Sequence, residues 1–284
     1  MYSKKLTIVF LFICLMTEIL SGRIKQSYEP YFFIQIADPQ FGFFTNNKDG
    51  FEKETMLFEK AVMEINRLKP DFVVVCGDMV HKQGDILQIT EIKRIVNLID
   101  PKIPVLYVPG NHDVGQVPDK ESLDKYKFLY GYDRFTFIHK GSRFIGYNST
   151  LINDKIPDLE QLGYEWLKSK LGESESFRHT ILFAHHPFIL KEFDEPETYF
   201  NMSPEYRTKY LDLFAENKVT AVFFGHLHNN AYAEYKGIQL VTTSSVGRPL
   251  ADAPSGFRIV KVFDDRIEHS YYGLDKIPVS ITFD

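Results

Sequence analysis

Five short apolar segments of the chain each run directly into an Asp, Asn or His residue, and this repetition restricts the fold more than any other feature. In one of them, Pro104 to Val108 precedes the turn pair Pro109-Gly110 and then Asn111, His112 and Asp113. Short apolar runs bounded by Gly or Pro predict buried strands. Four other segments show the same pattern: 32–37 precedes Asp38 and Gln40, 72–76 precedes Asp78, 181–184 precedes His185 and His186, and 221–224 precedes His226 and His228.

The polar residues after these strands are predicted to share one site, because ligands bind at the carboxyl ends of strands in an open α/β sheet. A polar turn that caps a helix would explain Gly110 to Asp113 alone equally well, but not the same pattern five times. Nitrogen and oxygen ligands in this mixture suit two divalent metal ions better than a nucleophilic triad.

Two metals need a shared ligand, and Asp38 and Asp78 are the strand-end carboxylates that directly follow a predicted strand. The two histidines of the last segment lie two residues apart, so on an extended segment both side chains point to the same side. Asn111 offers an amide oxygen as a further ligand. His112, its neighbour, is placed to donate a proton to a leaving oxygen.

Helical periodicity between the strands determines the expected fold class. Residues 51–68 and 86–99 are predicted helices, and Asp158 is predicted to cap a third. Strand–helix–strand units predict a sheet covered by helices, whereas paired apolar runs within 135–148, 231–242 and 257–272 predict hairpins. We expect an α/β sandwich of two mixed β-sheets with helices outside. The third helix should pack four residues inward, namely Leu159, Leu162, Trp166 and Leu167.

The segment 187–202 is predicted to be a lid or binding loop, because long loops in compact domains are usually functional. Its acidic residues indicate only a solvated surface. The net charge of −5, with acidic and basic residues interleaved, argues against a nucleic-acid partner, which would need a basic patch.

The N-terminus has the pattern of an export signal. Lys4 and Lys5 precede an apolar core at 6–16, and small residues follow at 21–22. We therefore expect a signal peptide at 1–22, a single domain at 23–284, and export to the periplasm or the exterior. The apolar run is shorter than the roughly 20 residues of a membrane span, so an uncleaved anchor is the alternative and no stable membrane insertion is expected after cleavage. Asn148 and Asn201 begin glycosylation sequons.

The ordered motifs resemble the signature of calcineurin-like metallophosphoesterases. The motifs are Asp-x-Gln, Gly-Asp, Gly-Asn-His-Asp, His and Gly-His-x-His, with Gln in place of the usual His, and they span Phe33 to His228. The segments 37–42, 76–81 and 199–203 are most similar to the branch of calcineurin-like phosphoesterase domain-containing proteins described as serine/threonine protein phosphatases. The tail from Ser244 to Tyr272 resembles that branch too.

The resemblance implies a four-layer α/β/β/α fold and two divalent metal ions, which could be Mn, Mg, Fe, Zn or Ca. It also implies that a metal-bound hydroxide attacks phosphorus in line while His112 protonates the leaving alkoxide. By position, one metal would be held by Asp38, Gln40 and His228, the other by Asn111, His185 and His226, with Asp78 bridging the two.

Two departures from the wider family bear on this site. Gln40 stands where most members have histidine, and an amide oxygen favours Mg, Mn or Ca over Zn or Fe at that position. His81 stands where calcineurin-type protein phosphatases have an aspartate that orients the catalytic histidine. Asp113 and His81 are therefore both candidates for orienting His112.

Three residues are assigned to the substrate side of the site. His186 is expected there rather than among the ligands, Arg248 could grip a phosphate or be an ordinary surface arginine, and Asn230 is the third. The predicted function is phosphomonoester hydrolysis on a small molecule or a phosphoprotein. A phosphodiesterase for cyclic nucleotides or lipid head groups, or a non-catalytic binding module, are the alternatives. The sequence does not fix the substrate or the oligomeric state.

Overall fold

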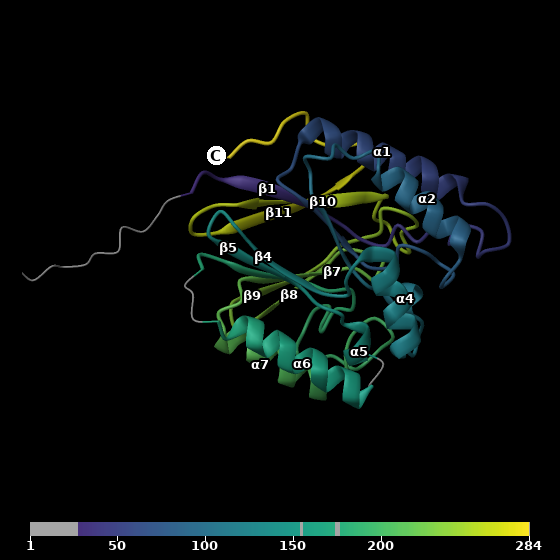
Figure 1. The fold of residues 1–284 in the computed structure, drawn as a ribbon. Helices are drawn as coiled ribbons and strands as arrows, with labels where there is room; N and C mark the ends of the chain where they lie inside the picture. Colours follow the sequence, from purple (N-terminus) through teal and green to yellow (C-terminus); the bar gives the residue numbers. More distant parts are fainter. Residues whose placement is uncertain (1–27, 154–155, 174–176, 284) are drawn as a thin grey trace, which may run out of the picture.

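The computed structural model describes residues 28–153, 156–173 and 177–283, which form two stacked β-sheets with helices on both outer faces (Figure 1). The leader predicted at residues 1–22 lies outside these residues. Within the described part, no helix is both long and apolar enough to span a bilayer.

The first sheet has the strand order β11-β10-β1-β2-β3 and mixes parallel and antiparallel pairs. β1, β2 and β3 run parallel, whereas β10 is antiparallel to β1 and to β11. Because Ile36 of β1 lies beside Val75 of β2, the loops after these two strands leave the sheet at one edge. The strand bounds are β1 (Tyr31–Ile36), β2 (Val73–Cys76), β3 (Val105–Val108), β10 (Gly256–Val262) and β11 (Ile267–Gly273).

The second sheet has the order β4-β5-β6-β7-β9-β8, with parallel pairs at its centre and an antiparallel strand at each edge. The carboxyl ends of β6 and β7 therefore also meet at one edge. The bounds are β4 (Phe135–His139), β5 (Ser142–Gly146), β6 (Thr180–Phe183), β7 (Ala221–Phe224), β8 (Ala231–Tyr235) and β9 (Ile238–Thr242).

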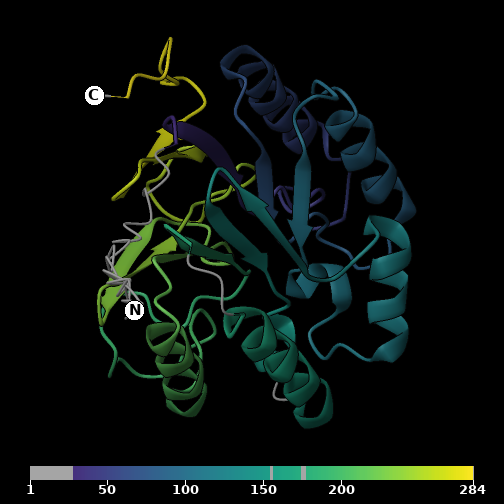
Figure 2. The same ribbon diagram turned by 60° about the vertical axis from the view of Figure 1, so that its left-hand side comes forward.

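Helices form the two outer layers, as Figures 1 and 2 show from two directions. α1 (Glu52–Leu68) and α2 (Ile86–Val96) cover the first sheet, and α6 (Pro157–Leu171) and α7 (Pro204–Glu216) cover the second. The Asp85 carboxylate caps α2 by accepting hydrogen bonds from the backbone nitrogens of Leu87 and Gln88. The shorter helices are α3 (Asn111–Val114), α4 (Lys120–Tyr130) and α5 (Thr150–Asn153).

A layer of phenylalanine rings fills the space between the sheets. Phe33 is fully buried and stacks on Phe72 with ring centroids 4.8 Å apart, and it meets Phe144, Phe183 and Phe223 edge-on. Each buried ring of this kind contributes about 1.5–3 kcal/mol of burial free energy. This layer holds the two sheets together and thereby fixes the distance between the strand ends of one sheet and those of the other.

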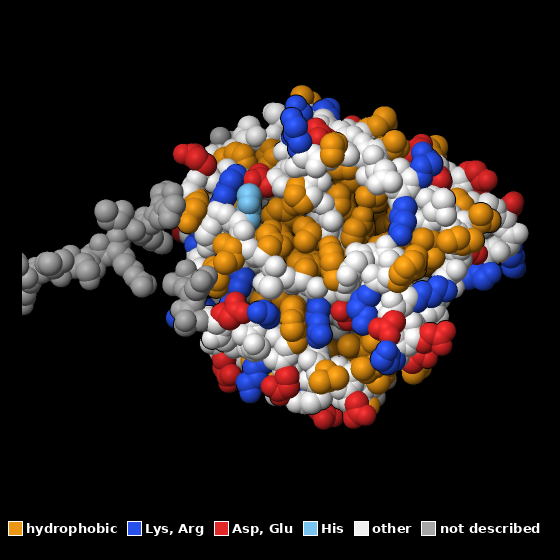
Figure 3. All heavy atoms as spheres, in the orientation of Figure 1, with side chains coloured by type: hydrophobic (Ala, Val, Ile, Leu, Met, Phe, Trp, Pro, Cys, Tyr) orange, Lys and Arg blue, Asp and Glu red, His pale blue; other side chains and the backbone are white. Residues whose placement is uncertain are grey.

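The inter-sheet core is less completely covered where the two edge strands β3 and β4 lie. Leu106, Tyr132 and Phe137 pack against that core but are only partly buried. The face in Figure 3 shows apolar side chains gathered in a hollow at its centre, between the helices of the two outer layers.

The predicted fold class is confirmed, with two corrections of detail. Leu162 does not pack inward, because it is 65% exposed on the outer face of α6. Asp158 is not the cap of that helix either. The N-cap position is Ile156, and Pro157 occupies the first turn, where its missing backbone donor costs nothing.

Candidate metal centre

The seven predicted ligands converge at the carboxyl ends of five strands that belong to both sheets. They follow β1, β2 and β3 in the first sheet and β6 and β7 in the second. All seven are buried, with exposed fractions between 0% and 4%. The residues are Asp38, Gln40, Asp78, Asn111, His185, His226 and His228.

The backbone at this site is strained. Asp38 (φ 51°), Gln40 (φ 40°), Asp78 (φ 51°), His226 (φ 68°) and His228 (φ 53°) all adopt the left-handed conformation. Non-glycine residues in this region cost about 1–3 kcal/mol each and cluster at functional sites. Five such residues therefore indicate that the fold holds these side chains in place against a local cost.

At Gly110 the backbone passes so close to the Asp78 carboxylate that no side chain fits between them. A Cβ atom on Gly110 would lie 2.1 Å from Oδ1 of Asp78. Any other residue at position 110 would therefore displace the carboxylate that lies between the two groups of ligands.

The first group contains Asp38, Asp78 and His228, whose nearest ligand atoms all lie within 4.8 Å of one another. Nε2 of His228 is 3.4 Å from Oδ1 of Asp38. The carboxamide of Gln40 lies beside this group, 3.2 Å from Oδ2 of Asp78, and its Oε1 is buried without a hydrogen-bond partner. At this site, the carboxamide oxygen of Gln40 is thus free to serve as a ligand.

The second group surrounds Nε2 of His185. This atom lies 3.1 Å from Oδ1 of Asn111, 3.2 Å from Nδ1 of His226 and 3.4 Å from Oδ2 of Asp78. Asp78 belongs to both groups, which is the position that a bridging carboxylate would occupy.

Backbone carbonyls fix the tautomer of all three histidines. Nδ1 of His185 donates to Cys76 (2.9 Å), Nε2 of His226 donates to Tyr199 (2.9 Å), and Nδ1 of His228 donates to Arg248 (2.6 Å). In the neutral rings, the opposite nitrogen therefore carries a lone pair directed into the centre, towards Asp78 from His185, towards Asp38 from His228 and towards His185 from His226.

The donor set fits divalent cations on these observations. Lone pairs on two imidazoles face each other at 3.2 Å between His226 and His185, and two buried carboxylates lie beside them. Among the described residues, neither Asp38 nor Asp78 forms an ion pair with a lysine or arginine. A cation between these groups would satisfy all of them.

The electrostatics of the isolated side chains agree. Burial would raise the pKa of Asp78, but the imidazoles of His185 and His112 hold it well below its ordinary value. Burial lowers the pKa of His185, but the carboxylates of Asp78 and Asp38 raise it to about 9. Without a metal, a proton on Nε2 of His185 would supply the positive charge between the carboxylates, and a bound metal ion would displace that proton.

His112 lies at the rim of the centre and is half-buried. Its backbone nitrogen donates to Oδ1 of Asp78 at 2.9 Å, and Nδ1 of its ring donates to the backbone carbonyl of His81 at 2.8 Å. Nε2 is then the ring nitrogen that can exchange a proton with a bound molecule.

The two candidates for orienting His112 differ in what they contact. Asp113 accepts hydrogen bonds from the backbone nitrogens of Met79 and Gly110, both at 2.9 Å, and so fixes the loop rather than the His112 ring. Burial and the nearby Asp78 raise the pKa of Asp113 to about 8. His81 acts on His112 through its backbone carbonyl, and its ring is stacked on the His112 ring.

The three residues assigned to the substrate side lie in different surroundings. His186 is buried among the centre's histidines, with its ring centroid 4.4 Å from that of His226, and its Nε2 has no partner among the described residues. The guanidinium of Arg248 lies over the Phe43 ring at 4.8 Å. Asn230 is turned away, because its Oδ1 accepts from Arg258 at 2.8 Å and from the backbone of Ser244.

Two residues at the centre were missed from the sequence. Tyr199, from the loop 187–202, places its hydroxyl 3.3 Å from Nδ2 of Asn111 in addition to its carbonyl contact with His226. Oγ of Ser149 accepts hydrogen bonds from the backbone nitrogens of both His185 (3.0 Å) and His186 (2.9 Å). The length of the loop and the family resemblance of segment 199–203 both pointed to the region of the first, and no sequence pattern signalled the second.

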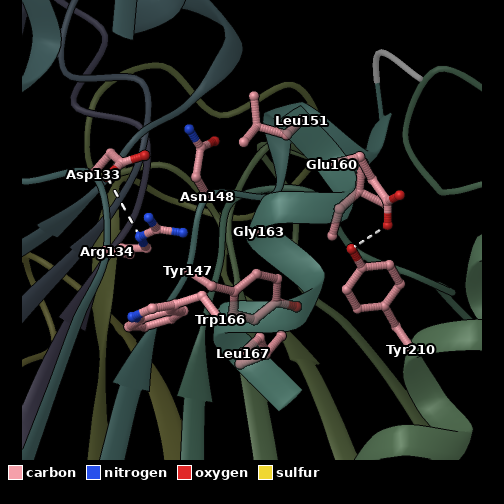
Figure 4. A pocket seen from close by; sticks show the side chains of 11 residues that line it. Asp133, Arg134, Tyr147, Asn148, Leu151, Glu160, Gly163, Trp166, Leu167 and Tyr210 are labelled. Carbon is pink, nitrogen blue, oxygen red and sulfur yellow. Dashed lines mark hydrogen bonds and ion pairs between the residues drawn. The ribbon is translucent and has the colours of Figure 1, made fainter. Parts of the chain in front are cut away.

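A separate, partly open cavity of about 20 Å³ lies beside α5 and α6 (Figure 4). Its lining includes the hydroxyl of Tyr147 and Nδ2 of Asn148, both buried without a hydrogen-bond partner. The volume suits a water molecule rather than a substrate.

The sequon residues Asn148 and Asn201 are only 7% and 3% exposed, so a glycan on either is incompatible with this fold.

Comparisons with known proteins agree with this geometry. The family profile described as "Calcineurin-like phosphoesterase" matches residues 33–230. "Serine/threonine-protein phosphatase CPPED1" of Rattus norvegicus is 36% identical over 266 residues, covering 87% of this chain and 85% of the relative. The Homo sapiens protein of the same name is 37% identical with the same coverage. A "Probable cyclic nucleotide phosphodiesterase" of Vesicomyosocius okutanii is 25% identical, covering 83% of this chain and 95% of the relative.

Solved structures share the fold. A purple acid phosphatase from yellow lupin (Lupinus luteus) superposes with a TM-score of 0.64 at 16% identity, covering 88% of this chain and 52% of that one. A dimetal phosphatase from Danio rerio has a TM-score of 0.57 at 15% identity, covering 87% of this chain and 97% of that one.

Proposed function

The chain belongs to the calcineurin-like phosphoesterase family, and on that premise we propose that it is a dinuclear phosphomonoesterase whose ligands are the seven residues of the metal centre. The observation that carries the proposal is the convergence of three carbonyl-fixed imidazoles, two amide side chains and two buried carboxylates. Asp78 lies with Asp38 and His228 in the first group and 3.4 Å from Nε2 of His185 in the second. A non-catalytic binding module would have no need for His112 at the rim of such a centre.

Asp38, Gln40 and His228 would hold one divalent ion, Asn111, His185 and His226 the other, and Asp78 both. When bound, the ions supply Lewis acidity at the phosphoryl oxygens. His112 would give the proton on Nε2 to the ester oxygen as its bond to phosphorus breaks. The carbonyl of His81, which accepts from Nδ1, keeps Nε2 directed at that oxygen.

Asn111 is preferred over His186 as the ligand of the second ion. Nδ2 of Asn111 donates to the Tyr199 hydroxyl, so its Oδ1 is the atom that faces His185. His186 is the competing ligand, because it can place a ring nitrogen within 4.8 Å of those of His185 and His226 and its Nε2 has no partner among the described residues, while its Nδ1 contacts Ser149 at 3.4 Å. Burial and the adjacent His226 and His185 also hold the pKa of His186 well below its ordinary value, so its ring is neutral beside the bound phosphoryl group.

For the substrate, we propose a phosphorylated serine or threonine, because the relatives that cover most of this chain carry the name of serine/threonine protein phosphatases. The alternative is a diester, as the name of the cyclic nucleotide phosphodiesterase relative suggests. Rates on p-nitrophenyl phosphate and on bis-p-nitrophenyl phosphate separate the two. A higher rate on the diester would overturn the monoesterase proposal.

Gln40 supports Mn or Mg over Zn or Fe as the working metals, since an amide oxygen is a harder ligand than imidazole. Elemental analysis of protein purified without chelator should find two ions per chain. One ion per chain in fully active protein would contradict the dinuclear proposal.

The leader supports export, with Lys4 and Lys5 before an apolar core and small residues at 21–22. An exported enzyme would meet extracellular phosphoesters rather than cytoplasmic phosphoproteins. N-terminal sequencing of the protein from the culture medium or periplasm should begin near residue 23. Recovery of an intact N-terminus in the membrane fraction would indicate an uncleaved anchor instead.

A further inference from the structure

Four side chains make successive stacking contacts beside the metal centre, and we call them the aromatic column: Arg248, Phe43, His81 and His112. The ring centroids of His112 and His81 are 4.9 Å apart with 22° between the planes. Those of His81 and Phe43 are 4.8 Å apart with 27° between the planes. The guanidinium of Arg248 lies 4.8 Å from the Phe43 centroid.

His81 supplies both of the contacts that orient the His112 ring. Its backbone carbonyl accepts from Nδ1 of His112 at 2.8 Å, and its ring covers one face of that imidazole. Among the described residues no carboxylate is hydrogen-bonded to the His112 ring, because Asp113 binds backbone nitrogens and Asp78 binds the His112 backbone nitrogen.

We propose that His81 and Phe43 are positioning residues that hold His112 in register with the leaving oxygen, in place of a carboxylate partner. The proposal rests on the proposed function, in which His112 is the general acid. Neither residue needs to touch the substrate to act in this way.

The column is anchored to both helices of the first outer layer. The backbone nitrogen of His81 donates to Phe41 at 3.0 Å and to Oε1 of Gln88 in α2 at 3.1 Å. Nε2 of His81 is 3.1 Å from Oδ1 of Asn46. The column can therefore hold His112 only while these backbone contacts hold His81.

Phe43 is fixed by the residues on either side of it. The backbone nitrogens of Gly42 and Phe44 both donate to Oε1 of the buried Glu54 in α1, at 3.1 and 2.9 Å. Arg248 adds a hydrogen bond from Nη1 to the Phe43 carbonyl at 3.2 Å. A ring held by its backbone on both sides is a firm surface against which His81 can stack.

Loss of this positioning has a distinctive kinetic signature. A general acid matters when the leaving group is a strong base and matters little when the leaving group departs readily as an anion. Misplaced by about 1 Å, a catalytic group can lose on the order of 10²-fold in rate. A disturbed column should therefore slow hydrolysis of phenyl phosphate far more than that of p-nitrophenyl phosphate.

The test compares kcat on these two substrates for five variants of the metal-loaded, full-length protein. His81→Ala and Phe43→Leu should lower kcat on phenyl phosphate about tenfold or more, and on p-nitrophenyl phosphate by less than about threefold. Both residue-81 variants keep the backbone carbonyl, and His81→Phe also keeps a ring that can stack on His112, so it should recover part of the loss seen in His81→Ala. His112→Ala sets the upper limit of the effect.

Phe44→Leu is the matched control. Phe44 is the next ring along the same loop. Its centroid lies 6.0 Å from the Arg248 guanidinium, but no described contact joins it to His81 or His112. Its rates on both substrates should stay near those of the wild type. Metal content is measured for every variant, because Phe43 also meets His228 edge-on at 5.3 Å.

An independent readout is the tautomer of His112 in the metal-free protein, followed by long-range ¹H–¹⁵N NMR. The wild type should show a proton fixed on Nδ1. His81→Ala keeps the backbone carbonyl that accepts this proton but loses the ring that holds the imidazole against it, so the variant should show exchange between both tautomers. A purely structural role for His81 would leave this signal unchanged.

The outcomes separate the two levels of the argument. If His112→Ala slows both substrates equally, the acid assignment of the proposed function fails and the column proposal falls with it. If His112→Ala shows the leaving-group dependence but His81→Ala and Phe43→Leu do not, only the column proposal is overturned. Equal losses on both substrates in these two variants, with two metals still bound, would also overturn it.

Discussion

Ser149→Ala should weaken metal binding and lower stability without removing any candidate ligand. The Ser149 hydroxyl is fully buried and accepts hydrogen bonds from the backbone nitrogens of His185 and His186. Alanine leaves both backbone nitrogens buried without an acceptor. They lie directly after the end of β6, where the chain places His185 in the metal centre. The variant therefore isolates the cost of holding the β6 strand end in place.

The magnitude follows from those two contacts. An unsatisfied buried donor costs about 1–3 kcal/mol, so two of them should lower the free energy of unfolding by roughly 2–6 kcal/mol. This is a large part of the total of about 5–15 kcal/mol for a typical domain. Displacement of His185 should also weaken metal binding by about 10–100-fold, as loss of a residue that orients a ligand does.

Urea unfolding of the metal-free proteins measures the first quantity, and calorimetric metal titration measures the second. Ser169→Ala is the matched control, because Ser169 is exposed on α6 and its side chain makes no described hydrogen bond. A change below about 1 kcal/mol for Ser149→Ala, with metal affinity equal to wild type, would refute the reasoning.

Three further predictions concern the ligands, the acid and the half-buried His269. Gln40→His should tighten Zn binding at the subsite of Asp38, Gln40 and His228. Gln40→Ala should raise the Mn concentration that activity requires. Equal metal affinities in the wild type and both variants would exclude Gln40 as a ligand. Asp78→Ala should lose bound metal. Elemental analysis of His112→Ala should still find two ions, while its kcat falls about 10²–10⁴-fold. Metal loss in His112→Ala would contradict the role of His112 as an acid. Burial, and then Arg258, lower the pKa of His269 to about 4 from 6.5, so the unfolded chain binds the proton first and stability should fall as pH drops from 6.5 towards 4. His269→Gln should flatten that part of the urea-stability profile, and an unchanged slope would count against the argument.

Much of the fold was predictable because its signals are local. Apolar runs bounded by turn residues gave the strands, and helical spacing gave α1 and α2, so the two mixed sheets follow from short stretches of sequence. Leu162 shows the limit of this reasoning. The face of α6 that the structure buries carries Glu160, Leu167 and Leu171, and Leu162 lies off that face and stays 65% exposed.

The convergence of the candidate ligands was also predictable, since they closely follow apolar strands and parallel strand ends meet at one edge. The orientation of those ligands was not. It depends on carbonyls of Cys76, Tyr199 and Arg248, which lie 109, 27 and 20 positions from the histidines they contact. The periodicity of apolar residues in the sequence does not predict these histidine–carbonyl contacts, because they form only once the two sheets have stacked.

The same distinction separates His81 and Asn230. The sequence placed both near the centre by their neighbours along the chain, and only the tertiary structure decided what each one does there. His81 faces His112 because α1 and α2 pin the two loops together, whereas Asn230 is drawn to the buried Arg258, whose guanidinium needs acceptors that its own strand does not supply. The sequence thus determined which residues reach the edge of the sheets, and packing between distant segments determined which atoms face the reaction.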